Sequence, residues 1–209
     1  MSPTDRTKPA GRNPASSEPA VSLHAELVEQ IDQHVLGAAR PRLEGLTDQE
    51  YLYDPAGGGR AWTVHPRLPD QDLPEGAIQG GAGDTVIDFA FPEPQPAPFT
   101  TIAWRLGHLI VGVLAVRSHA HLDGPEADYM TWDYATNAAE ALAQFDREYE
   151  RWMSGVRAWS EEDLQVPCGP AEGPYAQRPR AALVAHINRE LIHHLAEVAV
   201  LRDLYAHRS

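Results

Sequence analysis

Apolar residues recur at spacings of three and four in four segments, and this periodicity predicts four helices. The first covers residues 23–43, where Pro41 can end it. Its expected core stripe consists of Leu23, Leu27, Ile31, Val35 and Ala38. The second begins at Thr100 or Thr101, either of which can cap a helix, and continues to about His121. Because it is apolar on nearly every side, we expect it to be the most buried helix.

The third and fourth helices are expected over residues 134–159 and 180–205. The core stripe of the third consists of Ala138, Leu142, Phe145, Tyr149, Trp152, Val156 and Trp159. Residues 45–100 contain glycine and proline clusters that do not suit a helix interior, and a short strand over 85–89 is the one we expect there. Residues 160–179 form a second long connection. The pattern predicts an all-α four-helix bundle with long connections between helices 1 and 2 and between helices 3 and 4.

Composition adds expectations about domains and location. Residues 1–20 are rich in proline, serine and charge, so we expect a disordered tail followed by a single domain over 21–209. The first residues lack the apolar middle region of a secretion signal, and no apolar run reaches the roughly 20 residues that span a bilayer. The lone cysteine, Cys168, cannot form an internal disulfide. We therefore expect a cytoplasmic protein with no membrane partner.

The chain is strongly acidic. It carries 30 acidic against 17 basic residues, a formal net charge of −13, and no cluster of basic residues interrupts this acidity. A phosphate backbone would be repelled by such a surface. We therefore expect no nucleic-acid partner.

Three side chains of the second and fourth helices form a candidate metal site. Glu190 and His194 are four residues apart beside the apolar stripe of the fourth helix, so they share one face. A carboxylate turned into a core needs a positive partner. His108, in the most apolar run of the chain, completes the set if the two helices face each other. Three protein ligands and an open position are typical of catalytic zinc, and nickel or ferrous iron would accept the same residues.

Other interpretations of these residues remain open at this point. His108 alone could be a hydrogen-bonded core histidine, and Glu190 could pair with Arg189 or Arg105 instead of a metal ion. Glu197 could orient a ligand imidazole through its second nitrogen, and it forms a further pair with His193 four residues earlier. Glu197 and His193 are also candidates for a catalytic acid or base. Further histidines considered for the site or for a helix end are His34, His119, His121 and His186. Trp104, one turn before His108, could wall the site.

At these residues the chain resembles the DinB/YfiT-like family, whose members carry a metal site. The segment WRLGH, which ends at His108, is similar to the family's second-helix motif, and HINRELIHHLAEVAVLRDLY is similar to its fourth-helix motif. Many members have two histidines four apart on the fourth helix. Here Glu190 takes the first position, which resembles the mycothiol-dependent maleylpyruvate isomerase branch. The resemblance extends from about Leu23 to the C-terminus, with a long insertion over 57–98.

The resemblance implies an up-down-down-up bundle, often a homodimer, with a divalent metal ion at the end of a cleft. It also implies a small-molecule thiol such as mycothiol, bacillithiol or glutathione as co-substrate, together with an electrophilic substrate. The metal would lower the pKa of the thiol, and the thiolate would attack carbon in an S-transferase or isomerase reaction. Two rival hypotheses are a metal hydrolase with a metal-bound water nucleophile, and a non-catalytic metal-binding stress-response module.

Overall fold

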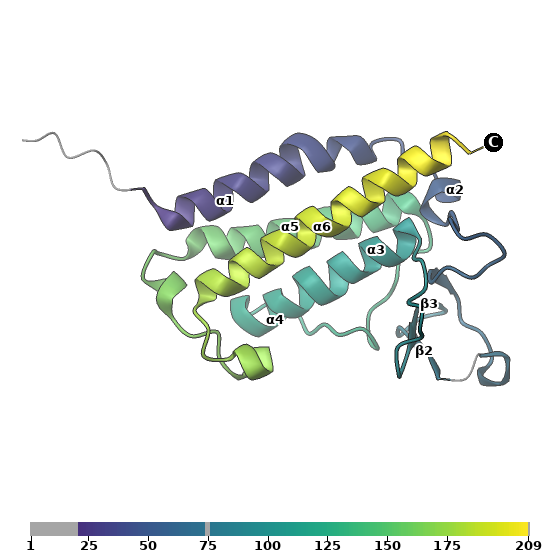
Figure 1. Cartoon of the computed structure of the whole chain (residues 1–209). Helices are drawn as coiled ribbons and strands as arrows, with labels where there is room; N and C mark the ends of the chain where they lie inside the picture. The colour runs from purple at the N-terminus through teal and green to yellow at the C-terminus, as the bar shows by residue number, and fades with distance from the viewer. Residues whose placement is uncertain (1–20, 74–75, 209) are drawn as a thin grey trace, which may run out of the picture.

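Four main helices pack side by side in the computed structural model, which describes residues 21–73 and 76–208 (Figure 1). The first is α1 (Leu23–His34), which continues as a π-helical segment (Val35–Ala39) and a 3-10 turn (Pro41–Leu43). The second consists of α3 (Ile102–His108), a π-helical segment (Leu109–Ala115) and α4 (Val116–Leu122). The third is α5 (Ala138–Ala158), and the fourth is α6 (Arg180–Ala206). The four predicted helices are confirmed.

Polar contacts between the helices fix their relative directions. Near its start α1 contacts the end of α5, since His24 Nε2 donates to the carbonyl of Val156 over 2.8 Å. The same part of α1 contacts the first half of α6, where Asn188 Nδ2 donates to the carbonyl of Leu27 over 2.9 Å. Arg105 in α3 lies 3.1 Å from Glu197 in the second half of α6. Farther along, Arg42 after α1 lies 3.3 Å from Asp203 near the end of α6, whereas His108 lies beside Glu190. The first and fourth helices therefore run in one direction, and the second helix runs against the fourth.

Side-chain caps explain where three of the helices begin. Ser22 accepts a hydrogen bond from the amide of Ala25, and Thr101 accepts one from Trp104 at the start of α3. Of the two threonines expected to cap the second helix, Thr101 does so. The third helix begins at Ala138, four residues later than expected, because Asn137 caps it and the residues before it form a turn-rich loop.

The core stripe predicted for the first helix is correct at Ile31 and Val35 but wrong at Leu23 and Ala38, which are exposed. Leu23 is the first residue of α1 and is 47% exposed. In the π-helical segment Val35–Ala39, hydrogen bonds span five residues, as from the amide of Arg40 to the carbonyl of Val35. This widening moves the residues after Val35 around the helix axis. Ala39 packs against the core where Ala38 was expected.

The second helix is the most enclosed part of the bundle. Its residues of 2% exposure or less are Ile102, Ala103, Leu106, Leu109, Ile110, Val111, Leu114 and Ser118. They face α5, α6 and the strands, so the expectation that this is the most buried helix is confirmed.

A small antiparallel sheet corrects the all-α prediction. It contains β1 (Val64–Pro66), β2 (Ala77–Gly80) and β3 (Thr85–Ala90) in the order β1-β3-β2. Val64 pairs with Ile87, and Ile78 pairs with Phe89. Only the strand near 85–89 was expected, because the flanking strands are three and four residues long and contain Pro66 or Gly80.

The sheet lies at one end of the bundle and packs against α3 through an aromatic cluster (Figure 1). Phe89 meets Trp104 and Tyr129 edge to face, with ring centroids 6.1 and 5.0 Å apart. The indole of Trp104 donates to the carbonyl of Asp88 over 2.9 Å. The long connection between the first two helices thus builds a wall around α3, at whose last residue His108 lies.

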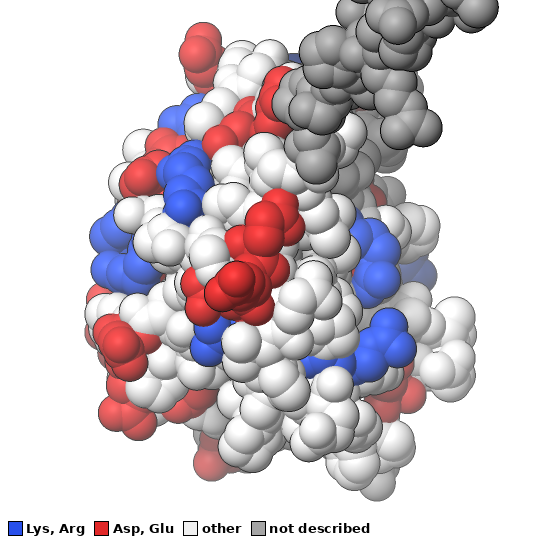
Figure 2. Space-filling view, turned by 90° about the vertical axis from the view of Figure 1, so that its left-hand side faces the viewer, with Lys and Arg blue, Asp and Glu red and all other residues white. Residues whose placement is uncertain are grey.

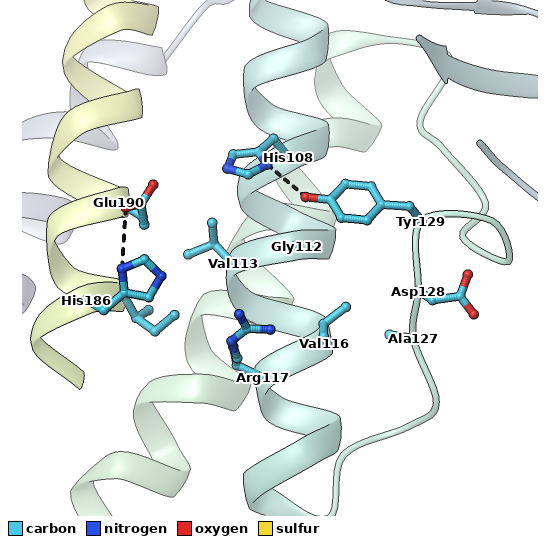
Figure 3. Close-up of a pocket in the computed structure, with 11 residues that line it drawn as sticks. His108, Gly112, Val113, Val116, Arg117, Ala127, Asp128, Tyr129, His186 and Glu190 are labelled. Carbon is cyan, nitrogen blue, oxygen red and sulfur yellow. Dashed lines mark hydrogen bonds and ion pairs between the residues drawn. The ribbon is translucent and has the colours of Figure 1, made fainter. Parts of the chain in front are cut away.

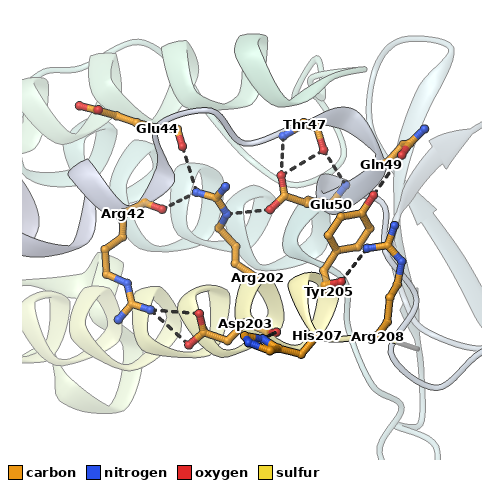
Figure 4. A network of polar contacts seen from close by, with 10 residues as sticks. All are labelled: Arg42, Glu44, Thr47, Gln49, Glu50, Arg202, Asp203, Tyr205, His207 and Arg208. Atoms are coloured by element: carbon orange, nitrogen blue, oxygen red, sulfur yellow. Dashed lines mark hydrogen bonds and ion pairs between the residues drawn. The ribbon is translucent and has the colours of Figure 1, made fainter.

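A polar network ties the end of α6 to the segment after α1 (Figure 4). Arg202 donates from Nε to Glu50 over 3.0 Å, and Tyr205 donates to Gln49 over 3.0 Å. Glu50 belongs to the short helix α2 (Asp48–Tyr51), which begins with a capping box formed with Thr47. These contacts hold the second half of α6 against the rest of the bundle.

The surface carries charges of both signs. Figure 2 views the end of the bundle away from the sheet, where acidic and basic side chains are interspersed among uncharged ones. No helix within residues 21–73 and 76–208 is long and apolar enough to cross a membrane.

Candidate metal centre

The structure brings His108, Glu190 and His194 together between the second and fourth helices. One ligand atom from each residue can be chosen so that all three lie within 4.8 Å of one another. His194 Nε2 is 3.5 Å from Glu190 Oε2, and the two imidazole rings meet edge to face with centroids 4.8 Å apart. The predicted convergence of these three groups is therefore found.

Two neighbours orient His108. Its Nδ1 forms a 2.8 Å hydrogen bond with the hydroxyl of Tyr129, and its ring stacks on Trp104 at 5.5 Å with an interplanar angle of 11°. Burial, followed by the nearby His194, lowers the pKa of His108 to about 4, so the ring is neutral at pH 7. When Nδ1 carries the proton and donates a hydrogen bond to the hydroxyl of Tyr129, the lone pair of Nε2 is free to bind a metal ion.

His194 is oriented in the same way by a carboxylate. Its Nδ1 is 2.6 Å from Glu197 Oε2, and that oxygen also lies 3.1 Å from Arg105 Nη1. Glu197 therefore has the orienting position predicted for it. A carboxylate that accepts a hydrogen bond from Nδ1 keeps the proton on that nitrogen, so the Nε2 atom that faces Glu190 carries no proton.

Glu190 is half-buried, and its two oxygens face different partners. Oε1 accepts a 3.1 Å hydrogen bond from Arg189 and is 3.5 Å from His186, while Oε2 faces His194. Burial acts to raise the pKa of Glu190, but its polar partners, above all the hydrogen bond from Arg189, lower it below its usual value, so the group is a carboxylate. The pairing with Arg189 considered from the sequence is present, whereas Arg105 pairs with Glu197 instead.

These residues fit a divalent transition-metal ion. Two ligands about 2.1 Å from a tetrahedral ion are about 3.4 Å apart, close to the 3.5 Å between His194 and Glu190. Two neutral imidazoles and a carboxylate are ligands that zinc, nickel and ferrous iron accept. Three ligands would leave at least one position of the ion for another molecule.

A second group of possible ligands consists of His193, His194 and Glu197. It is less suited to an ion, because Glu197 already occupies Nδ1 of His194 and the side chain of His193 is 61% exposed. His193 Nε2 lies 3.4 Å from Glu197 Oε1 at the surface. The sequence-based roles of His193 and Glu197 as acid or base remain predictions.

A cavity of about 470 Å³ opens beside the candidate metal centre (Figure 3). His108 and Glu190 line one end, and Arg117 and His186 lie farther along. The wall between them is apolar and includes Val113, Val116, Ala127 and Ile187. Tyr129 reaches His108 across the position of Gly112, where an added Cβ would overlap the tyrosine hydroxyl.

The remaining histidines have other places in the structure. His186 lines the cavity beside Glu190, one helical turn before it. His34 is half-buried in α1 and does not line this cavity. His119 bonds the carbonyl of Gly124, and His121 contacts Glu172 over 2.9 Å. Both lie in the last turn of α4, as expected, and His121 in addition contacts a carboxylate from a distant loop.

Sequence reasoning missed Tyr129, which lies in the loop between α4 and α5. No spacing along the chain links it to His108, since the loop's path depends on the sheet packed against it. The glycine at position 112, one turn after His108, was the available signal, because a glycine in a buried helix can mark close approach of another group.

Comparisons with known proteins identify a family but no close relative. The searches of curated proteins and of solved structures gave no match. The comparison with protein families matches residues 30–198, which include all four main helices in whole or in part and the three candidate ligands. The chain therefore belongs to the DinB superfamily.

Proposed function

We propose that this protein is a divalent-metal-dependent enzyme that activates a small-molecule thiol for transfer to, or isomerisation of, an electrophilic substrate. The observation that carries the proposal is the convergence of His108, Glu190 and His194 on one point at the end of a cavity. Both imidazoles are held through Nδ1, so their Nε2 atoms are free to bind an ion.

Each residue of the centre has a defined part in this proposal. His108, Glu190 and His194 would hold the ion, and Tyr129 and Glu197 would orient the two rings. A bound divalent ion would lower the pKa of a thiol that reaches it, so that a nucleophile is available near pH 7. The apolar wall formed by Val113, Val116 and Ile187 would exclude water from the reacting group.

The carboxylates around the cavity favour a thiol over a hydrolytic water. A hydrolase needs a base near its water. Glu197 is engaged by His194 and Arg105. Asp128, the other carboxylate lining the cavity besides Glu190, accepts bonds from Met130 and Thr131. Neither carboxylate is therefore placed to take a proton from a hydrolytic water, which supports the thiol-dependent reaction; a hydrolase would have to use His186, which also lines the cavity.

Metal binding is tested by titrating metal-free protein with Zn²⁺, Ni²⁺ and Fe²⁺ against a competing chelator. We expect one ion per chain, and we expect its affinity to fall at least 100-fold in the triple variant His108→Ala, Glu190→Ala, His194→Ala. His193→Ala is the matched control, because its ring belongs only to the second ligand group. A similar loss of affinity in this control would assign the ion to the second group, because His194 belongs to both groups.

Thiol dependence is tested with the metal-loaded protein, monochlorobimane and one thiol at a time, using mycothiol, glutathione and bacillithiol. We expect one of them to be consumed faster than background, and the rate to return to background in His108→Ala. If no thiol reacts while the ion is bound, the thiol-dependent function is wrong. Turnover of esters or amides without thiol would then favour a hydrolase.

A further inference from the structure

A second cavity of about 620 Å³ adjoins the one at the candidate metal centre. The two share Arg117 and His186 in their walls, and Figure 3 shows both residues in the first cavity. From Glu190 to Ala182, which lines the second cavity, α6 rises through eight residues, or about 12 Å. A small molecule of that length can therefore reach from the centre into the second cavity.

The walls of the second cavity carry more positive than negative charge. Three arginines line it, Arg117, Arg178 and Arg189, against a single carboxylate, Glu172. This excess occurs in a chain with a net charge of −13. Since a cavity concentrates the field of the charges that line it, the local potential favours an anion.

Glu172 already contacts two basic side chains of the protein. Its Oε1 is 3.1 Å from Arg117 Nε and 2.9 Å from His121 Nε2, and only 8% of its side chain is exposed. Arg178, in contrast, has no ion pair within the described parts of the chain, and it is exposed to solvent. Its guanidinium is thus the cation available to a ligand.

The loop that carries Arg178 is closed by backbone hydrogen bonds. The amide of Cys168 donates to the carbonyl of Arg178 over 2.8 Å, and the amide of Gly169 donates to that of Ala176 over 2.9 Å. Glu172, near the middle of this loop, anchors it to α4 through Arg117 and His121. The wall is therefore formed before any ligand arrives.

We propose that the second cavity binds a carboxylate at the far end of the thiol co-substrate, with Arg178 as its principal partner. This inference rests on the proposed thiol-dependent function, and it selects thiols with a terminal carboxylate over thiols whose far end is uncharged. A guanidinium matches a carboxylate with two parallel hydrogen bonds. One available arginine suits a single negative charge better than a phosphate, which carries about 1.5 to 2 charges at pH 7.

The test measures binding of S-methylglutathione by calorimetry, because this probe has two carboxylates but no free thiol and needs no metal. We expect the metal-free protein to bind it about tenfold more tightly than its diethyl ester. Arg178→Gln should remove this difference, and Arg178→Lys should keep part of it. Arg208→Gln, which removes an exposed arginine at the other end of α6, should change nothing.

Each outcome has a defined meaning. Equal affinity for the probe and its ester, or an unchanged preference in Arg178→Gln, would overturn the inference even if zinc binds and a thiol is consumed. A preference that depends on Arg178 supports it even if no thiol reacts, in which case the proposed function fails separately. Displacement of the probe by inorganic phosphate at a similar concentration would overturn the assignment to a carboxylate.

Discussion

The hydrogen bond between Tyr129 and His108 offers the sharpest test of the metal centre. Tyr129→Phe removes only the hydroxyl that lies 2.8 Å from His108 Nδ1. Burial raises the pKa of Tyr129 to about 12, so the group is an uncharged hydroxyl and the substitution deletes one hydrogen bond and no charge. With an ion on Nε2, the proton of His108 must be on Nδ1, where the variant leaves it without a partner.

The expected loss of metal affinity follows from the hydrogen-bond donor that Tyr129→Phe leaves without a partner. A buried donor without a partner costs about 1 to 3 kcal/mol, which corresponds to about a 5- to 150-fold change in an equilibrium constant. The range agrees with the roughly 10- to 100-fold loss that follows removal of a ligand's hydrogen-bond partner. We therefore expect Tyr129→Phe to bind Zn²⁺ about tenfold more weakly, measured by competition with a chromophoric chelator.

The matched control is Tyr51→Phe. Tyr51 is 2% exposed, and its hydroxyl donates to the carbonyl of Ala135 over 3.3 Å, away from the candidate ligands. Tyr51→Phe should lower the free energy of unfolding in urea by about as much as Tyr129→Phe does, because each variant loses one buried hydrogen bond. Its affinity for Zn²⁺ should equal that of the wild type. Equal zinc affinities for the two variants and the wild type would refute the role of Tyr129 in orienting His108.

Three further predictions concern the packing around the site and the sheet. Gly112→Ala should destabilise the protein by about 1–3 kcal/mol in urea unfolding, because the added methyl group overlaps the hydroxyl of Tyr129. An unchanged unfolding midpoint would contradict the close approach of Tyr129 to Gly112. Leu114→Ala, at a fully buried position, should cost about 2–5 kcal/mol in the same assay, and a cost below about 1 kcal/mol would disprove its place in the core. The hydrogen bond with Asp88 raises the pKa of His65, so this pair should stabilise the fold fully below about pH 6.5, with the effect lost as pH rises through the raised value. The difference in Tm between wild type and His65→Gln should accordingly be larger at pH 5.5 than at pH 8.5, and the opposite order would rule out the charged pair.

The helices could be predicted because each must bury one stripe of apolar residues, and the capping residues mark where a helix can start. Thr101 illustrates this, since its position before an apolar run is visible in the sequence and its side chain caps α3. The same logic placed Glu190 and His194 on one face, and the apolar surroundings of His108 indicated the helix opposite. The pairing of Glu190 with His194 depends on local spacing alone, whereas the place of His108 also required that the second and fourth helices face each other.

Features that depend on distant parts of the chain could not be predicted in this way. The sheet depends on pairings between strands too short to show an alternating pattern, such as that of His65 with Val86. Tyr129 reaches the site because the sheet supports its loop, and His121 finds Glu172 fifty-one residues away. The partners are separated in sequence, so no local pattern indicates them.

The π-helical segment Leu109–Ala115 has a consequence for how the chain tolerates insertions and deletions. In an unbroken α-helix, the nine residues from His108 to Arg117 would turn through about 900°, so the two side chains would point in opposite directions. Both nevertheless line one cavity, because the wider turns of the segment rotate the later residues back. Removing a single residue between them would let regular winding return over eight residues, about 800°, which keeps Arg117 within about a quarter turn of His108. The two ends of the cavity should therefore stay together after such a deletion, whereas adding a residue to a regular helix at this place would have turned them apart.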